Sequence, residues 1–356
     1  MGKTLGTTAQ TLSPRKREIL RRIINHYVRE VHPISSQILA DEIHVSSATV
    51  RNELAALEEQ GFLLQPHTSG GRVPTDQAYR FLVEELLNQL AGTISHRARV
   101  SEVYRQLGHE VEALLEGTLD LLTEMTGYVA WVSLPTPSAL DIKSISFVEV
   151  EKDEVLVVLV TGAGAMQSRR IKLELKAEDL RLPQLAEKLN NYLRGRSIID
   201  VNYDELQKIT LETVAVPESL LTTLQEFFSG LARTNERVFF GNALRLALEP
   251  EFSNVDSLSN VINVLQDRER FIRGLRSQLN ERVVQTIIGS ENTIEDLHDC
   301  SLVLSRYGLP AGSEGTVGVI GPTRLFYNRA LPWVKVIGEV VANALQEATD
   351  EGEVAK

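Results

Sequence analysis

Residues 34–60 of this 356-residue chain read ISSQILADEIHVSSATVRNELAALEEQ, and their apolar spacing predicts two short helices joined by a tight turn. Leu39 and Ile43 lie one helical turn apart in the first helix, and Ser35 or Ser36 can cap its start. In the second helix, positions 50, 54 and 57 are apolar and fall on one face. Because the connection is only three residues long, the helices must pack at an angle. The stretch therefore predicts a helix-turn-helix.

The outward face of the second helix carries residue types that read DNA. At 100° per residue, Ala48 and Asn52 point outward, and Thr49 and Arg51 lie on the flanks. Small residues let a helix approach base edges, while Arg and Asn offer paired donors to guanine and adenine. We therefore expect Ser47, at the start of the helix, and these four residues to contact the major groove. Two amphipathic helices with ordinary solvated outer faces are the alternative interpretation.

The preceding residues predict a basic helix that begins at Ser13-Pro14, with serine as the cap and proline in the first turn. A broad apolar stripe from Ile19 to Val31 would face inward. Lys16 and Arg17 lie on or beside the outer face, where we expect them to meet phosphates.

The following residues predict a β-hairpin wing. Residues 62–65 and 72–73 can pair around the turn PHTSGG, in which His67 and Thr68 lie at the tip. We expect His67 and Thr68 to contact DNA, and Arg72 to reach a phosphate or the minor groove. A further helix starts at Thr75, so residues 1–92 read as a winged helix-turn-helix. Some winged helices bind only protein, and this alternative stays open.

Charge is distributed unevenly along the chain, whose net charge is −11. Residues 1–80 contain 10 Lys/Arg and 8 Asp/Glu, whereas the remainder contains 27 and 40. A basic end on an acidic body suits a DNA-binding unit attached to a larger partner domain. The single cysteine, Cys300, excludes an intrachain disulfide and favours a reducing cytoplasm. No apolar run reaches the length of a membrane span, and no spacing indicates a metal or cofactor site.

The rest of the chain predicts a mixed α+β body. Strand patterns occupy residues 128–175 and return at 283–320, and the segment between them is mostly helical. A sheet interrupted in this way indicates an insertion. Apolar residues from Leu220 to Leu231 suit either a dimer interface or a buried core. Arg324, beside Gly321-Pro322, suits either an anion site or an ion pair.

Residues 46–80, SSATVRNELAALEEQGFLLQPHTSGGRVPTDQAYR, resemble the DNA-binding end of the bacterial heat-inducible transcription repressor family HrcA. The resemblance continues in Gly289-Ser290-Glu291-Asn292 and in GTVGVIGPTRLFY at 315–327. It implies a multidomain α+β fold in which a GAF-like domain, residues 93–190 and 276–350, carries an inserted, mostly helical dimerisation domain at 191–275.

The resemblance also implies a function and partners. A homodimer would bind an inverted-repeat operator and repress chaperone operons until heat shock, with the chaperonin GroEL as a further partner. Two other hypotheses compete with this one. A regulator could be gated by a small molecule in the GAF-like domain, which would rest on fold analogy alone. An enzyme with a DNA-binding accessory has no catalytic constellation to support it.

Overall fold

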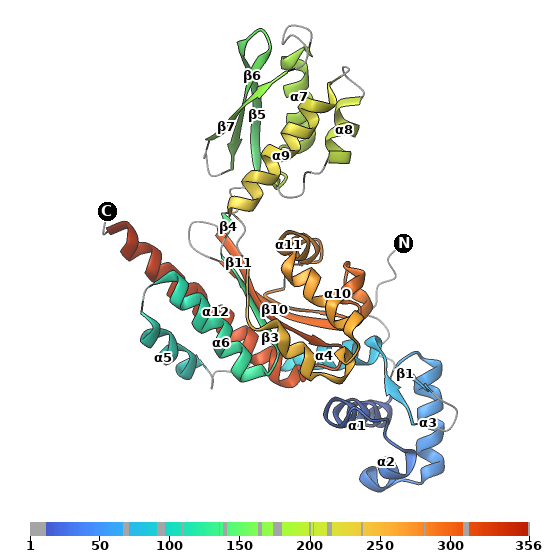
Figure 1. Ribbon diagram of the computed structural model, residues 1–356. Coiled ribbons are helices and arrows are strands. Elements are labelled where there is room, and N and C mark those ends of the chain that lie inside the picture. Colours follow the sequence, from blue (N-terminus) through green and yellow to red (C-terminus); the bar gives the residue numbers. More distant parts are fainter. Residues whose placement is uncertain are drawn as a thin grey trace.

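The structure of the protein is a computed structural model that describes residues 12–66, 71–90, 97–108, 110–134, 136–137, 141–162, 166–173, 180–198, 201, 203–211, 216–235, 238–280, 282–308 and 313–354. It has three parts, which lie one above another in Figure 1. We call residues 12–90 the head, the central sheet with its helices the trunk, and the unit formed by residues 142–235 the inserted domain. The multidomain α+β architecture expected from the sequence is confirmed.

The head is a winged helix-turn-helix, as predicted. Its elements are α1 (Pro14–Glu30), α2 (Ser36–Ile43), α3 (Ser47–Glu59), β1 (Leu63–Leu64), β2 (Val73–Pro74) and α4 (Asp76–Gln89). Ser13, Ser35, Ser46 and Thr75 cap the four helices by accepting backbone N–H bonds. Gly61 ends the third-helix region with φ +81, a conformation that glycine adopts without strain. The wing strands pair antiparallel but are only two residues long each.

The trunk is built on an antiparallel sheet whose main order is β8-β3-β11-β10-β9. The strands are β3 (Val129–Ser133), β8 (Val238–Phe240), β9 (Val284–Ile288), β10 (Cys300–Gly308) and β11 (Ser313–Pro322), with β4 (Thr136–Pro137) beside β11. Side chains of β3 alternate between two hydrophobic clusters, because Ala130 and Val132 join one and Val129 and Trp131 the other. The sheet is therefore covered on both faces.

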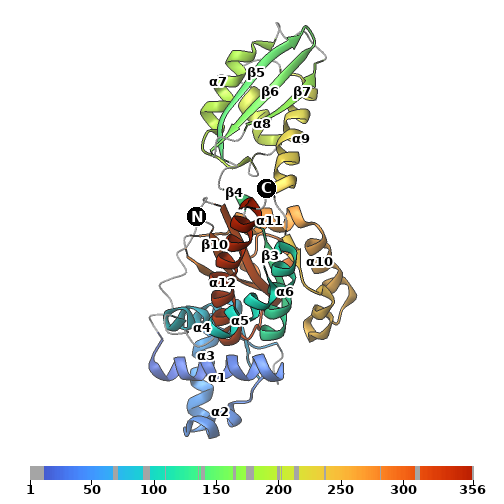
Figure 2. The ribbon, with the colours of Figure 1, turned by 90° about the vertical axis from the view of Figure 1, so that its left-hand side faces the viewer.

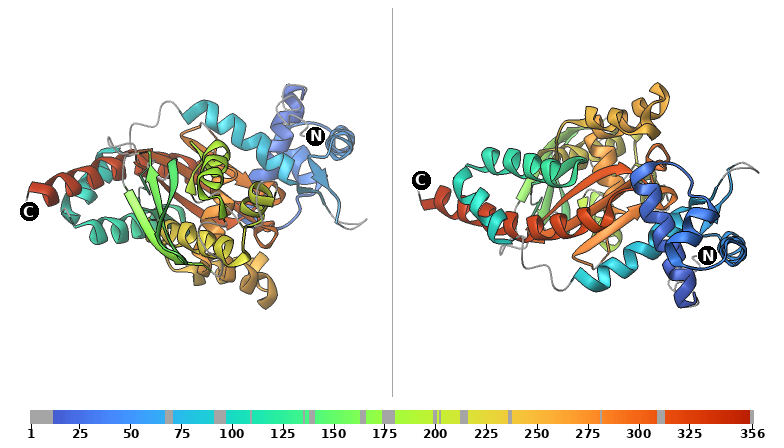
Figure 3. Two further views of the ribbon diagram at one scale, coloured as in Figure 1. Left: turned by 90° about the horizontal axis from the view of Figure 1, so that it is seen from above. Right: turned by 90° about the horizontal axis from the view of Figure 1, so that it is seen from below.

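Helices from distant parts of the chain cover these two faces. One face packs against α5 (Arg97–Leu107), α6 (Val111–Thr126) and α12 (Tyr327–Val354), and α6 and α12 run side by side in Figure 3. The other face packs against η7 (Ala243–Leu248), η8 (Pro250–Phe252), α10 (Val255–Gln266), α11 (Arg268–Arg276) and η10 (Glu295–Leu297). The short 3-10 helix η9 (Gly289–Glu291) follows β9 at the end nearer the head.

The inserted domain has its own sheet and core. Its strands β5 (Ile142–Glu151), β6 (Glu154–Thr161) and β7 (Met166–Lys172) pair only with one another. Its helices are α7 (Leu182–Leu193), α8 (Tyr203–Leu211) and α9 (Glu218–Asn235). The chain leaves the trunk after β4 and returns at β8, which pairs with β3. Both ends of the insertion thus join strands of the trunk sheet.

This division differs from the predicted limits of 191–275. Strands β5 to β7, which we expected in the GAF-like sheet, form the sheet of the inserted domain, so that domain is itself α+β. Helices α10 and α11, which we expected in the insertion, pack on the trunk sheet. The reason is that alternation identifies a strand but says nothing of the sheet it joins. Short connections keep each of these strands beside its sequence neighbour instead.

The apolar stretch beginning at Leu220 belongs to this second core. Leu220, Leu221, Leu224, Phe227 and Phe228 are all buried against the strands and helices of the inserted domain. Of the two interpretations offered by the sequence, the buried core is the one that the structure shows for these five residues.

Candidate nucleic-acid interface

Helix α3 is held against the head by one face and leaves the other free. Val50, Leu54 and Leu57 are buried in the core of the head, as the spacing predicted. Ser46 accepts the backbone N–H of Thr49 at 3.1 Å and so fixes where the helix begins. Ala48, Arg51, Asn52 and Ala55 are exposed on the opposite side. The head therefore presents a small-residue face flanked by an arginine and an asparagine.

The polar groups on this face are available to a ligand. Within the described part of the chain, Arg51 makes one side-chain contact, in which its Nη2 donates to Ser47 Oγ at 3.3 Å, so most of its five donors have no partner there. Asn52 has no hydrogen-bond partner within the described part of the chain. Thr49 is half-buried and its hydroxyl is 2.8 Å from that of Ser46. Arg51 and Asn52 can thus offer paired donors to base edges without breaking a strong internal contact.

The first turn of α1 brings two of the expected basic residues to the surface of the head. Lys16 is half-buried, and its backbone N–H, 3.3 Å from Ser13 Oγ, completes the helix cap. Arg17 is half-buried as well, and its Nε donates to the carbonyl of Leu12 at 3.1 Å. The Lys16 ammonium is the freer of the two charges to meet a phosphate.

The wing differs from the prediction at its basic residue. Arg72 Nε lies 2.8 Å from Glu58 Oε2, so the wing arginine forms an ion pair with the last turns of α3. Its side chain is 20% exposed. A phosphate at this position would have to compete with Glu58, which the sequence did not indicate. His67 and Thr68 lie outside the described residues.

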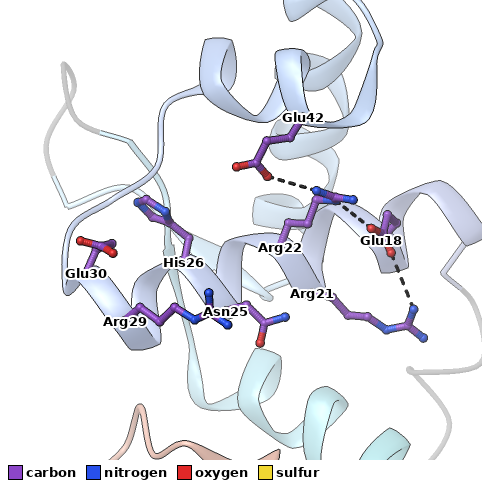
Figure 4. Close-up of a pocket in the computed structure, with 8 residues that line it drawn as sticks. All are labelled: Glu18, Arg21, Arg22, Asn25, His26, Arg29, Glu30 and Glu42. Carbon is purple, nitrogen blue, oxygen red and sulfur yellow. Dashed lines mark hydrogen bonds and ion pairs between the residues drawn. The ribbon is translucent and has the colours of Figure 1, made fainter.

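A cavity of about 410 Å³ opens on the head along α1 and α2. Figure 4 shows its lining of charged and polar side chains: Glu18, Arg21, Arg22, Asn25, His26, Arg29, Glu30 and Glu42. Arg22 Nε lies 2.7 Å from Glu18 and its Nη1 3.2 Å from Glu42. None of the lining residues comes from α3 or the wing. The neutralised charges give this cavity no clear preference for an anion.

Sequence reasoning missed the contacts that hold the head on the trunk. Arg324 donates to Glu251 and Glu249, each at 2.6 Å, and to the carbonyl of Val28 at 3.2 Å. Burial opposes its charge, but the bonds and charges of the two glutamates outweigh this and raise the pKa of Arg324 above its usual value. Arg324 thus forms an ion pair, which is one of the two roles that the sequence suggested for it. Its glutamate partners carry no signal in the sequence.

In the part of the chain that the structure describes, no group of three or more His, Cys, Asp or Glu side chains is placed to hold a metal ion. The helices found there also lack any span of the length and apolarity that crossing a bilayer requires.

Comparison with known proteins supports a DNA-binding role for the head. Residues 11–88 match the family described as "Winged helix-turn-helix transcription repressor, HrcA DNA-binding", and residues 112–331 match "HrcA protein C terminal domain". The heat-inducible transcription repressor HrcA of Thermosynechococcus vestitus is 33% identical over 337 residues, covering 91% of this chain and 95% of its own. That of Natranaerobius thermophilus is 30% identical, covering 97% and 99%.

The solved structures add a similar fold. A crystal structure described as that of a hypothetical protein aligns with a TM-score of 0.60 and 24% identity, covering 95% of this chain and all of the other. Three observations agree on the family. They are the winged helix with an exposed α3 face, the trunk of GAF-like α+β fold, and relatives of one name that match over almost their whole length. This chain belongs to the HrcA family of heat-inducible transcription repressors.

Proposed function

We propose that this protein represses chaperone operons by binding an inverted-repeat operator as a homodimer, and that heat relieves the repression. The observation that carries the proposal is the exposed α3 face, with Arg51 and Asn52 free, in a winged helix of the HrcA family. The protein would act in the cytoplasm through binding alone, without catalysis.

The expected contacts divide into base reading and backbone holding. Arg51 and Asn52 would read base edges, and the small Ala48 with Ser47 and Thr49 would let α3 approach them. Lys16 and Arg17 would hold phosphates beside the recognition helix. The wing residues His67, Thr68 and Arg72 would complete the contact, Arg72 by exchanging Glu58 for a phosphate or by bridging the two.

A second copy of the chain fits the outer face of the inserted sheet. Val155, Val157 and Leu159 of β6 are buried against the helices, so Leu156, Val158 and Val160 point to the other face. Val148 of β5 pairs with Leu156, and Met166 of β7 with Val160, and these flanking side chains are 50% and 69% exposed. The three strands lie in front of the helices in Figure 2. An apolar sheet face of this kind suits self-association.

Sedimentation of charged variants tests this interface. Val148→Asp and Met166→Asp place a charge on the exposed edge of the face and should shift the protein towards monomer without unfolding it. Leu248→Asp is the matched control, because Leu248 is 78% exposed on η7 of the trunk. A wild-type monomer, or dimers unaffected by either substitution, would exclude this interface.

Footprinting on DNA upstream of chaperone operons tests the proposed function itself. We expect protection of an inverted repeat, and its loss in the double variant Arg51→Ala/Asn52→Ala. Arg273→Ala on α11 is the control, since Arg273 is an exposed arginine of the trunk. If the double variant binds the operator as tightly as the wild-type protein does, α3 is not the reading helix.

The chaperonin GroEL enters this proposal through the family resemblance. We expect chaperonin added during refolding to increase the fraction of protein that binds the operator. Titration of active protein with a stoichiometric operator duplex measures that fraction directly. An unchanged fraction at complete refolding would remove the chaperonin from the proposal.

A further inference from the structure

The turn η9 of the trunk receives the start of α4. Asp76, the first residue of α4, accepts two hydrogen bonds from Ser290, from the backbone N–H at 2.9 Å and from the hydroxyl at 2.8 Å. Gly289 has φ +50, and a Cβ at that position would lie 2.4 Å from both carboxylate oxygens of Asp76. Glycine is therefore needed both for the turn and for the close approach of the head. This gives a physical role to the Gly289-Ser290-Glu291-Asn292 motif.

Arg80, one helical turn after Asp76, makes more hydrogen bonds to the trunk than Asp76 does. Its Nε donates to Glu291 Oε1 at 2.8 Å, its Nη1 to Thr286 Oγ1 at 2.8 Å, and its Nη2 to the Thr286 carbonyl at 3.0 Å and to Glu291 Oε2. Four of the five guanidinium donors are thus used on the trunk. Glu291 is itself fixed, because its Oε2 accepts the backbone N–H of Ile288 at 2.8 Å. A bidentate pair of this kind sets direction as well as distance.

Arg324 makes a second contact at a different helix of the head. It follows β11, and its side chain is only 6% exposed. Its bond to the Val28 carbonyl satisfies one of the last carbonyls of α1, which have no partner within the helix. Glu249 and Glu251 hold the guanidinium from the trunk side. Arg324 thus joins the C-terminal end of α1 to the trunk.

Two contacts on two helices limit the head more than one contact would. A single ion pair leaves rotation about that point, whereas contacts on both α1 and α4, together with the packing of α4 on α12, oppose it. Helix α3 packs against α1 through their shared hydrophobic core, so its direction follows theirs. We propose that Arg80 and Arg324 are positioning residues, which hold each head in one orientation so that a dimer presents its two α3 helices at a set spacing. This inference rests on the proposed function, in which a dimer reads an inverted repeat.

The head does not need these two arginines for its own core. That core consists of apolar side chains such as Ile19, Ile23, Val50 and Leu57, and the arginines bond to trunk groups or to one carbonyl of the head. A variant that lacks the Arg80 contact should therefore keep its ability to bind one half-site. What it should lose is the correct placement of the second head.

The test measures full-length protein on duplexes that carry one half-site or two half-sites at varied separation. A shift of about five base pairs turns the second half-site to the opposite face of the duplex, so wild-type affinity should fall steeply from its optimum. For Arg80→Ala we expect roughly a tenfold loss at the best separation and a flatter dependence on separation, because the second binding event is less well placed. Binding to a single half-site should stay within about twofold of wild type.

Two further variants make the result decisive. Glu291→Gln keeps the shape of the partner but removes its charge, and should give a smaller change of the same kind. Arg282→Ala is the matched control, since Arg282 joins Glu84 of the same α4 at 3.1 Å but is 57% exposed. If Arg80→Ala and Glu291→Gln fold and keep the wild-type dependence on separation, the positioning role is overturned. If the wild-type protein itself shows no preferred separation of the two half-sites, the proposal that a dimer binds both half-sites fails.

Discussion

The outward face of α3 and the contact between head and trunk use arginine in opposite ways. Arg51 is exposed and, among the described residues, makes one bond, to a serine in the preceding turn of its own helix. Arg324 is nearly buried and donates to two carboxylates and a carbonyl. A guanidinium whose donors are mostly free can bind a ligand, whereas one whose donors are mostly engaged holds structure. Residue type alone therefore does not separate an arginine that is open to a ligand from a structural one.

The largest expected effect is on stability, at the contact between head and trunk. Arg324→Ala would leave Glu249 and Glu251 facing each other and the Val28 carbonyl without its partner. Breaking a buried pair in this way should lower the free energy of unfolding by about 3 kcal/mol. Unfolding by denaturant measures this loss of free energy. Arg282→Ala, which removes an exposed pair, should cost no more than about 1 kcal/mol. Equal losses of unfolding free energy in the two variants would contradict the difference between a buried and an exposed arginine pair.

The next effect is a pH dependence within the trunk, close to Arg324. Tyr128 accepts the backbone N–H of Phe326 at 3.0 Å, and burial raises its pKa from 10.0 to about 12. The folded protein thus holds this proton more tightly than the unfolded chain. Its contribution, at most roughly 2 to 3 kcal/mol, is complete below pH 10 and is lost as the pH rises towards 12.

Unfolding by denaturant at a series of alkaline pH values measures this dependence. In Tyr128→Phe the free energy of unfolding should fall less steeply above pH 10, because the titrating phenol is gone. The difference in slope against pH should correspond to at most one proton. The same slope in both proteins would show that other groups cause the alkaline loss.

The third effect concerns the open face and should appear in binding alone. Arg51→Ala removes paired donors to a base, so affinity should fall by about 1–3 kcal/mol and specificity should relax at one operator position. Stability should change by less than about 0.5 kcal/mol, because Arg51 is exposed. Competition assays with operators substituted at single positions test this. A uniform loss over all sequences would assign Arg51 to the phosphates.

The smallest effect is expected at the edge of the interface. Lys16→Ala should weaken binding evenly across sequences and lower the slope of log affinity against log salt by about 0.9, the value for one phosphate contact. Titrations at several salt concentrations give that slope. If the slope is unchanged, Lys16 does not contact the backbone, and the reading face is confined to α3 and the wing.

The head could be predicted almost element by element, and the trunk could not. Helices α1 to α4 are marked by local signals, namely serine or threonine caps, a stop glycine and apolar spacing within one turn. Strands β5 to β7 were recognised as strands but assigned to the wrong sheet. Val155 to Val160 was expected in the GAF-like sheet, yet it lies in the inserted domain, where it is covered on one face only. A run of apolar residues indicates that a strand is buried but does not indicate which element covers it.

The candidate site shows the same limit. Arg51 and Asn52 could be placed outward because a helix converts spacing into direction. The pairing of Arg72 with Glu58, and of Arg80 with Glu291, joins residues 14 and 211 positions apart. Such pairs depend on how whole elements pack, and no local pattern encodes them.

Local patterns in the sequence were enough to establish the kind of head, the outward face of α3 and the family to which the chain belongs. These features follow from interactions within one or two helical turns. The folded protein was needed to show which strands form the inserted domain, which face of its sheet stays open, and which arginines hold the head on the trunk. Those outcomes depend on contacts between residues far apart in the chain, where burial and charge are set by packing.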